Sequence, residues 1–262
     1  MSELLKNIKV DSSWKKFINS DEIKKTLKDI EVKIGSNFTP KENVLRFLET
    51  DLKKIKVIIL GQDPYPQEGV ATGRAFEVGD KCTWLESISQ TSLINIIKAI
   101  YYMDQGGDID IDNIRQEIGK KFKINPSIKC WFCNLENQGV LFLNTAFTCK
   151  EKPIEEKPKK EKSKEKYSNA HSGIWNPFTE KLIRFIILRK PTCKWLLWGK
   201  YAESIIDQYP CIKEGINRYT CCHPSYVPKT KDKINCNFIK DSAKGLIETG
   251  IDWLGNKDLA SS

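Results

Sequence analysis

The sequence predicts an α/β fold in a single domain, with parallel strands joined by helices. Apolar runs rich in β-branched residues have the composition of buried strands, and Gly, Asp, Asn or Pro bounds them. Segments with helical spacing separate these runs, and helices between the strands of one sheet imply parallel strands. A length of 262 residues suits one α/β domain with a sizeable core.

The elements of the N-terminal half follow from apolar spacing. Apolar residues three and four positions apart predict helices, and a compact apolar run predicts a strand. We expect, in order, a helical opening region through Trp14, Phe17, Ile23 and Leu27, a helix over 42–48 after Pro40, a strand over 56–60 and a helix over 92–101.

The C-terminal half continues the alternation of strands and helices. We expect, in order, a polar loop over 103–113, a helix starting near 114, a strand over 139–144, a helix after Asn176-Pro177, a strand ending at Gly199 with a helix directly after it, and a strand over 218–222. The junction at Gly199 and Lys200 combines exposed amides with a positive charge, so it is a predicted phosphate site.

Residues 150–166 differ from the rest of the chain, because they are almost wholly charged and include two prolines. Such a segment buries too little apolar area to offset the entropy of ordering it, so we expect a mobile surface insert. Its lysines offer contacts to phosphates, but runs of mixed charge are more often solvated faces without a ligand.

The charge balance favours a polyanionic partner. Lys and Arg number 43 against 34 Asp and Glu, which gives a net charge of +9 and a pI near 9.0. Nucleic acid is the first candidate partner and an anionic membrane surface the second. The first 17 residues are interrupted by charges, which argues against a signal peptide or membrane helix. We expect a soluble intracellular protein, in the cytoplasm or, in a eukaryote, the nucleus.

Nine cysteines, an odd number, predict reduced thiols in a reducing compartment rather than a disulfide framework. Cys130 and Cys133, together with Cys221, Cys222 and His223, raise a metal or redox site as the alternative. A structural zinc site usually has two closely spaced ligand pairs, and neighbouring residues of a strand point to opposite faces. We therefore expect packed thiols, with no metal and no cofactor.

Polar residues follow three of the predicted strands: Asp63, Asn144 and His223. The carboxyl ends of parallel strands meet at one edge of the sheet, where open α/β sheets bind ligands. Taken alone, Asp63 is more simply explained as a turn residue, because Asp-Pro is common turn chemistry. The convergence of three such residues favours a functional site.

These three side chains suit chemistry on a nucleobase. Asn144 offers a donor and an acceptor to the edge of a pyrimidine. Asp63 can orient water and stabilise positive charge, and His223 can donate to an oxygen that becomes anionic as a base departs. These roles fit cleavage of an N-glycosidic bond and, less specifically, a deaminase or phosphotransferase without metal.

Other functions lack their signatures. The zinc deaminase motif is absent, because Ser172 and Gly173 follow His171 where H-x-E is needed. No G-x-x-x-x-G-K-[ST] motif of a P-loop enzyme occurs. A nuclease normally needs several carboxylates for a divalent metal, and only Asp63 is expected at this edge. A non-catalytic DNA-binding protein remains open.

Several stretches occur in a specific order and spacing. They are VIILGQDPYP (57–66), GRAFEV (73–78), SLINIIKAI (92–100), GVLFLNTAFT (139–148), WNPFTEKLI (175–183), WLLWGKYA (195–202), HPSYV (223–227), CNF (236–238) and IDWL (251–254). With them the chain closely resembles family-1 uracil-DNA glycosylases over about residues 40–255. The resemblance implies a central four-stranded parallel sheet flanked by helices, in a monomer that needs no metal and flips the target nucleotide into a pocket.

The resemblance also implies a role for each residue at the base. Asp63 would activate water and stabilise the oxocarbenium-like sugar, and His223 would donate to uracil O2. The pocket would be formed by Asn144 reading O4 and N3–H, the Gln62 backbone contacting O2, Phe76 stacking on the ring, and Tyr65 filling the space beside C5, where the methyl of thymine would clash.

Further residues are implied to contact DNA. Ser92, Gly199, Lys200 and Ser225 would grip phosphates, a role compatible with helix capping and turn formation. Val227 stands where the family has the leucine that enters the space left by the flipped base, and Tyr226 stands where the family usually has proline. Pro66 replaces the usual histidine near the substrate phosphate, and Lys200 replaces a small polar residue. Residues 86–91 lack the expected prolines, and the insert at 150–166 replaces a short loop near DNA.

The leading hypothesis is therefore excision of uracil from single- or double-stranded DNA in base excision repair. One alternative is a glycosylase for a modified base, although Tyr65 should exclude bulky C5 substituents. Another is a weakly active homologue that serves as a DNA-binding or replication-accessory subunit. The expected partner is DNA and not a membrane, with a proteinaceous glycosylase inhibitor or a replication protein as candidate protein partners.

Overall fold

The structure, a computed structural model, describes residues 2–152, 167, 169–226 and 236–256. The chain forms two compact units: the first contains residues 1–55, 60–80 and 141–193, and the second contains residues 56–59, 81–140 and 194–262. Each unit is thus assembled from three separate segments of the sequence. The single-domain organisation expected from the sequence stays a prediction.

A four-stranded parallel sheet is flanked by helices, which confirms the predicted fold class. The strands are β2 (Val57–Gly61), β3 (Val140–Asn144), β5 (Lys194–Trp198) and β6 (Arg218–Cys221), in the order β3-β2-β5-β6. Ile58 of β2 lies opposite Trp195 of β5, and Leu196 lies opposite Tyr219 of β6. Every residue of β2 and β3 is buried, which explains why these strands are apolar throughout rather than alternating.

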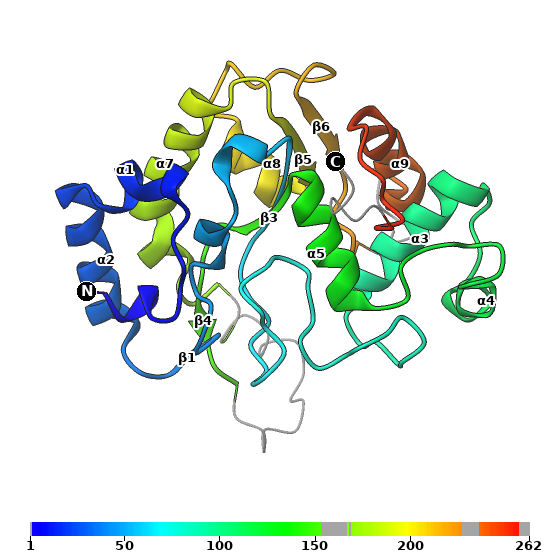
Figure 1. Cartoon of the computed structure of the whole chain (residues 1–262), viewed down its shortest axis with the longest axis horizontal. Helices are drawn as coiled ribbons and strands as arrows, with labels where there is room; N and C mark the ends of the chain where they lie inside the picture. Colours follow the sequence, from blue (N-terminus) through cyan, green and yellow to red (C-terminus); the bar gives the residue numbers. More distant parts are fainter. Residues whose placement is uncertain (1, 153–166, 168, 227–235, 257–262) are drawn as a thin grey trace. The chain divides into compact units, whose positions relative to one another are not determined.

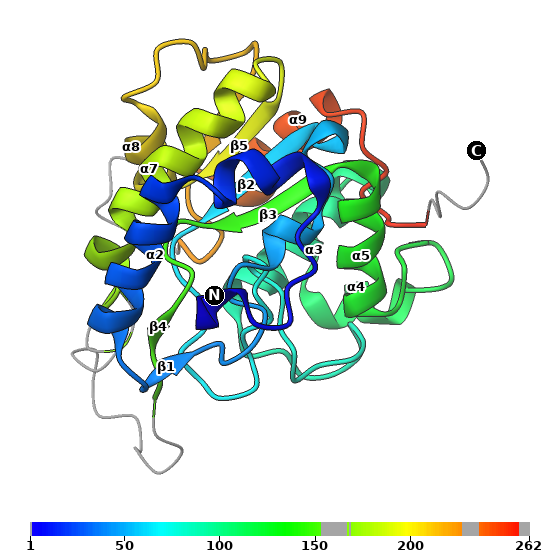
Figure 2. The ribbon, with the colours of Figure 1, turned by 60° about the vertical axis from the view of Figure 1, so that its left-hand side comes forward.

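The first unit packs two long helices together. Its regular elements are α1 (Lys15–Ile18), α2 (Asp21–Ile34), α7 (Ser172–Arg189), β1 (Phe38–Thr39) and β4 (Cys149–Lys150), with 3-10 turns at Glu3–Leu5, Ser12–Trp14, Arg46–Glu49 and Leu52–Lys54. The Ser20 hydroxyl caps α2, and the helix buries Ile23 and Leu27, as the apolar spacing predicts. α2 lies beside α7 in Figure 1, and Figure 2 shows β1 beside β4, with which it pairs antiparallel.

The second unit contains five further α-helices among the described residues. They are α3 (Thr91–Gln105), α4 (Ile111–Glu117), α5 (Ile128–Gln138), α8 (Lys200–Ile206) and α9 (Phe238–Glu248). α3 lies beside α9 (Figure 1), while α9 packs on β6 and α8 on β5. No helix in the described ranges has the length and apolar character needed to cross a membrane.

Several predicted elements are corrected by the structure. The helix expected over 42–48 is wrong: the segment turns at Asn43, which has φ +59, and only a 3-10 helix follows from Arg46. A left-handed residue cannot continue a right-handed helix. The loop expected over 103–113 is shorter, because α3 extends to Gln105 and α4 begins at Ile111, where Asp110 caps it. The helix expected after Pro177 begins five residues before that proline.

The cysteine prediction is wrong for one pair. Cys222 and Cys236 form a disulfide, with Cα atoms 6.1 Å apart, a separation within the usual range for a bridge. The pairing arises because the start of α9 comes beside the end of β6. The other seven cysteines, all among the described residues, are free thiols. Most of the charged insert, residues 153–166, lies outside the described residues.

Candidate active site

The GQDPYP loop leaves the sheet directly after β2. The Thr145 N–H donates to the Gly61 carbonyl (3.1 Å), and the Ala146 N–H donates to the Gln62 carbonyl (2.9 Å), so the loop stays joined to the residues after β3. Gly61 is required here, because a Cβ at this position would overlap the Asn144 side-chain oxygen. The close approach of the two chains brings the start of the loop against the Asn144 amide.

The far end of the loop is also anchored. The Cys149 thiol donates to the Pro64 carbonyl (3.2 Å), and the Lys152 N–H donates to the Pro66 carbonyl (2.8 Å). Burial raises the pKa of the Cys149 thiol, with the nearby charge of Asp63 as a lesser cause, so the sulfur keeps its proton and remains a donor. Bonds on both sides of Asp63, together with two prolines, therefore hold the turn in one conformation.

The Asp63 carboxylate lies in a partly desolvated place. Burial raises its pKa above the ordinary value of 3.8, because the ionised form loses hydration. The Asn169 N–H donates to Oδ2 at 2.8 Å and lowers the pKa in part. A carboxylate with a raised pKa and one hydrogen bond from the protein is a stronger base than a solvated aspartate.

Tyr65 buries its hydroxyl without a hydrogen-bond partner among the residues that the structure describes. Burial raises the pKa of this phenol, so the side chain is neutral. A buried hydroxyl normally finds a partner, because an unsatisfied one costs free energy. The orientation of the ring therefore does not depend on a hydrogen bond of its hydroxyl to a described residue.

Phe76 adopts a backbone conformation that is rare for a bulky residue, with φ +67. The loop around it is fixed by a buried ion pair between Arg74 and Glu77 at 3.0 Å, and the Thr72 hydroxyl donates to the same carboxylate at 2.5 Å. The Ala75 N–H donates to the Phe142 carbonyl of β3. Strained residues that their surroundings hold in place are typical of ligand sites.

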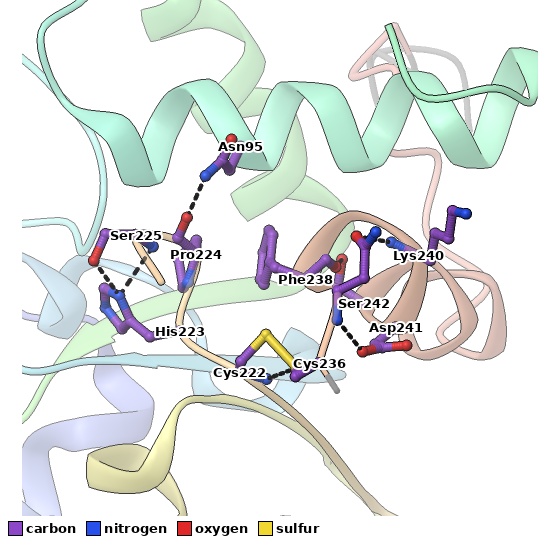
Figure 3. The surroundings of a disulfide bond; sticks show 11 residues. Asn95, Cys222, His223, Pro224, Ser225, Cys236, Phe238, Lys240, Asp241 and Ser242 are labelled. Atoms are coloured by element: carbon purple, nitrogen blue, oxygen red, sulfur yellow. Dashed lines mark hydrogen bonds between the residues drawn. A yellow bond between two sulfur atoms is a disulfide. The ribbon is translucent and has the colours of Figure 1, made fainter. Parts of the chain in front are cut away.

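His223 follows β6 and is oriented by Ser225 (Figure 3). The Ser225 N–H donates to His223 Nδ1 at 3.1 Å, and the Ser225 hydroxyl lies 2.7 Å from the same atom. An Nδ1 that accepts a hydrogen bond carries no proton, so in the neutral ring Nε2 carries it and is a donor. Burial lowers the pKa of this imidazole although part of the residue is exposed, which favours the neutral form.

Three further contacts fix the segment that contains His223. The Asn95 side chain of α3 donates to the Pro224 carbonyl at 2.5 Å, and the Cys222–Cys236 disulfide ties the preceding residue to the start of α9 (Figure 3). Gly199 has φ +100, and a Cβ there would lie 2.8 Å from the His223 Cβ. Glycine at 199 is therefore needed for the packing of the histidine.

The residues predicted to contact DNA occupy different settings. Ser92 lies in the first turn of α3, Lys200 is exposed at the start of α8, and Tyr226 is half-buried. The hydroxyl and the backbone N–H of Ser225 both contact His223 Nδ1. Val227 lies outside the described residues.

One cluster in the described part of the chain has spacing suited to a metal ion: Cys222, Cys236 and Asp241. The two sulfurs are bonded to each other, and the Asp241 carboxylate accepts the Asn237 N–H at 2.8 Å. Sulfurs bonded to each other in a disulfide are not thiolate ligands, so the cluster serves as a structural cross-link.

The structure thus brings the predicted residues together in two groups. In the first unit, Gln62 and Asp63 share one loop, which begins against Asn144. In the second unit, Gly199 and Ser225 both contact His223. Asn169 and Asn95, which contact these groups, were not predicted from the sequence. Asn169 follows the charged insert, where no periodic pattern marks it, and Asn95 lies on a helix predicted for its apolar face alone.

Comparison with known proteins identifies relatives of this chain. A model of the uracil DNA glycosylase superfamily matches residues 48–246. A uracil-DNA glycosylase of Fusobacterium nucleatum is 28% identical over 268 aligned positions, which cover 96% of this chain and 99% of that protein. A crystal structure of UNG from Nitratifractor salsuginis has a TM-score of 0.65 at 22% identity, covering 96% of this chain and 95% of the other. A mutant of mimivirus UNG in complex with UGI has a TM-score of 0.53 at 21% identity, covering 82% and 70%.

Proposed function

Because the chain belongs to the uracil-DNA glycosylase superfamily, we propose that it excises uracil from DNA by hydrolysing the N-glycosidic bond, which leaves an abasic site. The observation that carries this proposal is the state of Asp63. Its carboxylate has a raised pKa and lies on a loop that is anchored on both sides. A base in this setting suits the activation of water.

We assign the carboxylate of Asp63 to the sugar. As the bond from C1′ to N1 breaks, positive charge develops on the sugar, and the negative carboxylate stabilises it. The electron pair of the broken bond leaves with uracil. Water adds to C1′, and Asp63 accepts the proton that the water loses. The support for this role is the position of Asp63 directly after β2 and its single hydrogen bond within the described ranges.

His223 is assigned to the leaving base. The departing uracil carries negative charge that is delocalised from N1 onto O2 and O4, so a donor aimed at O2 lowers the barrier. The support is the hydrogen bond from the Ser225 N–H to Nδ1, which leaves the proton on Nε2. The lowered pKa of His223 favours the neutral ring, which keeps its Nε2 proton as a hydrogen-bond donor until the base departs.

The remaining pocket residues are assigned to recognition of uracil. Asn144 would pair with O4 and N3–H, the Gln62 backbone N–H would contact O2, and Phe76 would stack on the ring. Tyr65 would close the space beside C5, so that thymine is excluded by its methyl group. Support comes from the fixed backbone of this loop and from the unusual conformation of Phe76.

The DNA contacts follow the same assignment. Ser92, Gly199, Lys200 and Ser225 would hold phosphates, Tyr226 and Val227 would approach the space left by the flipped base, and Pro66 would border the substrate phosphate. The net charge of +9 supports binding to either single- or double-stranded DNA. We further propose that the chain acts as a monomer.

The GQDPYP and HPS motifs support the narrower assignment to family 1. A mimivirus UNG binds UGI, and we propose that UGI also binds this protein. Inhibition of base release by stoichiometric UGI is the expected result.

The test of the function is base release from matched single-stranded oligonucleotides that contain one uracil, thymine or cytosine. We expect release of uracil alone. Tyr65→Ala should then release thymine as well, because the methyl group gains room, while it still releases uracil. DNA binding by the wild type without release of uracil would contradict the proposed function and favour either a modified base as the substrate or the accessory role.

A further inference from the structure

Asn169 contacts two residues of the GQDPYP loop at once. Its backbone N–H donates to Asp63 Oδ2 at 2.8 Å, and its side-chain oxygen accepts a hydrogen bond from the Gln62 side chain. In the described part of the chain, this N–H is the only hydrogen-bond partner of the Asp63 carboxylate. Oδ1 is therefore left for water, and the direction in which it points depends on where Asn169 holds Oδ2.

The backbone of Asn169 is itself held in place. Its φ is +64, in the left-handed region that asparagine tolerates better than most residues. Its carbonyl accepts the Ser172 N–H at 3.1 Å, at the first residue of α7. This conformation aims the N–H away from α7 and toward Asp63.

The start of α7 is anchored by buried side chains. The Trp175 indole N–H donates to the Thr148 hydroxyl oxygen at 2.8 Å, and that hydroxyl lies 3.0 Å from His171 Nδ1. Because the oxygen already accepts from Trp175, its own proton is available to His171. His171, two residues after Asn169, is thus held against Thr148 in the segment that follows β3.

We propose that Asn169 is a positioning residue for Asp63, through a backbone N–H that its left-handed conformation holds against Oδ2. This inference rests on the proposed role of Asp63 as the catalytic carboxylate. Among the described residues, the Asn169 N–H is the group that donates to the carboxylate, so the orientation of Asp63 depends on it. An N–H bonded to the ionised form stabilises that form and limits its rotation.

The test compares two substitutions that differ in their backbone preference. Asn169→Gly keeps the left-handed conformation and the N–H, while Asn169→Val strongly disfavours that conformation because its side chain is β-branched. The pKa of the Asp63 carboxyl is measured in the free protein by carbon NMR, with Asp63→Asn to assign the signal. Cys149, the titratable group coupled to Asp63, does not interfere, because burial keeps its thiol protonated.

We expect Asn169→Val to raise the pKa of Asp63 and to lower kcat for uracil release about tenfold with little change in KM. Asn169→Gly should keep the pKa of the wild type and most of its kcat. Equal effects of the two substitutions, or an unchanged pKa in Asn169→Val, would overturn the proposal.

A measurement on the wild type protects the test against a variant that fails to fold. The amide proton resonance of Asn169 should shift with pH at the pKa of Asp63, and the shift should vanish in Asp63→Asn. A resonance that does not titrate would refute the proposal. Because these NMR measurements need no substrate, they separate a failure of this inference from a failure of the proposed function.

Discussion

Asp63 meets two opposing demands. Its proposed activity as a base needs the ionised form in a partly desolvated environment, and the same desolvation raises the free energy of that form in the folded state. Only one hydrogen bond from the described residues offsets this cost. The residue should therefore lower the stability of the protein while it supports the reaction.

This conflict gives a pH-dependent prediction for Asp63→Asn. The pKa of Asp63 in the folded state lies above 3.8, so as pH rises from that value the unfolded chain ionises first. The free energy of unfolding of the wild type falls across this interval and the loss persists at higher pH, whereas the asparagine variant has no such loss. Urea unfolding from pH 3.5 to 7 should show the variant gaining stability relative to the wild type as pH rises. A difference that is constant with pH, or that shrinks, would count against the raised pKa.

Single residues differed in how well the sequence alone identified them. Asp63, Asn144 and His223 could be predicted as site residues because polar residues at the ends of apolar strands stand out. The tautomer of His223 could not be predicted, since it depends on the geometry of the Ser225 N–H. Asn169 was missed because it lies 106 positions from Asp63 and no local pattern connects them.

The loops that hold the site residues depend on contacts with distant segments. The GQDPYP loop is pinned by Cys149 and Lys152, and the His223 segment by Asn95 and the Cys222–Cys236 disulfide. The four strands of the parallel sheet were predicted within one or two residues because their apolar runs are continuous, whereas β1 and β4 were not predicted. α5 and α9 were missed: α5 mixes cysteine and asparagine with its apolar residues, and α9 mixes lysine, aspartate, serine and glycine with them.

The disulfide predicts a measurable loss of stability in Cys236→Ser. The bridge closes a loop with a sequence separation of 14, for which the entropy of the unfolded chain predicts a contribution of about 3 kcal/mol. Urea unfolding should show this loss in the variant, and the wild type should fall to the same level in dithiothreitol. Cys130→Ser, at an exposed free thiol, is the matched control and should change little. A wild type whose unfolding is unaffected by dithiothreitol would contradict the prediction.

Across the whole molecule, the fold class was predictable because alternating strands and helices leave few arrangements of a parallel sheet. The division into two compact units was not, since each unit combines three distant segments. The positive charge indicated nucleic acid but not the reaction. The reaction follows from specific residues, because a fold alone does not determine function.

The most direct test of the central claim is the single-turnover rate of uracil release by the wild type, Asp63→Asn and His223→Ala on one oligonucleotide at pH 7. We predict that Asp63→Asn lowers the rate about 10²–10⁴-fold through loss of the base, and that His223→Ala lowers it about 10²–10³-fold through loss of the donor to O2. DNA binding should be retained in both variants. Release of uracil at the wild-type rate by Asp63→Asn would contradict the proposed role of the carboxylate.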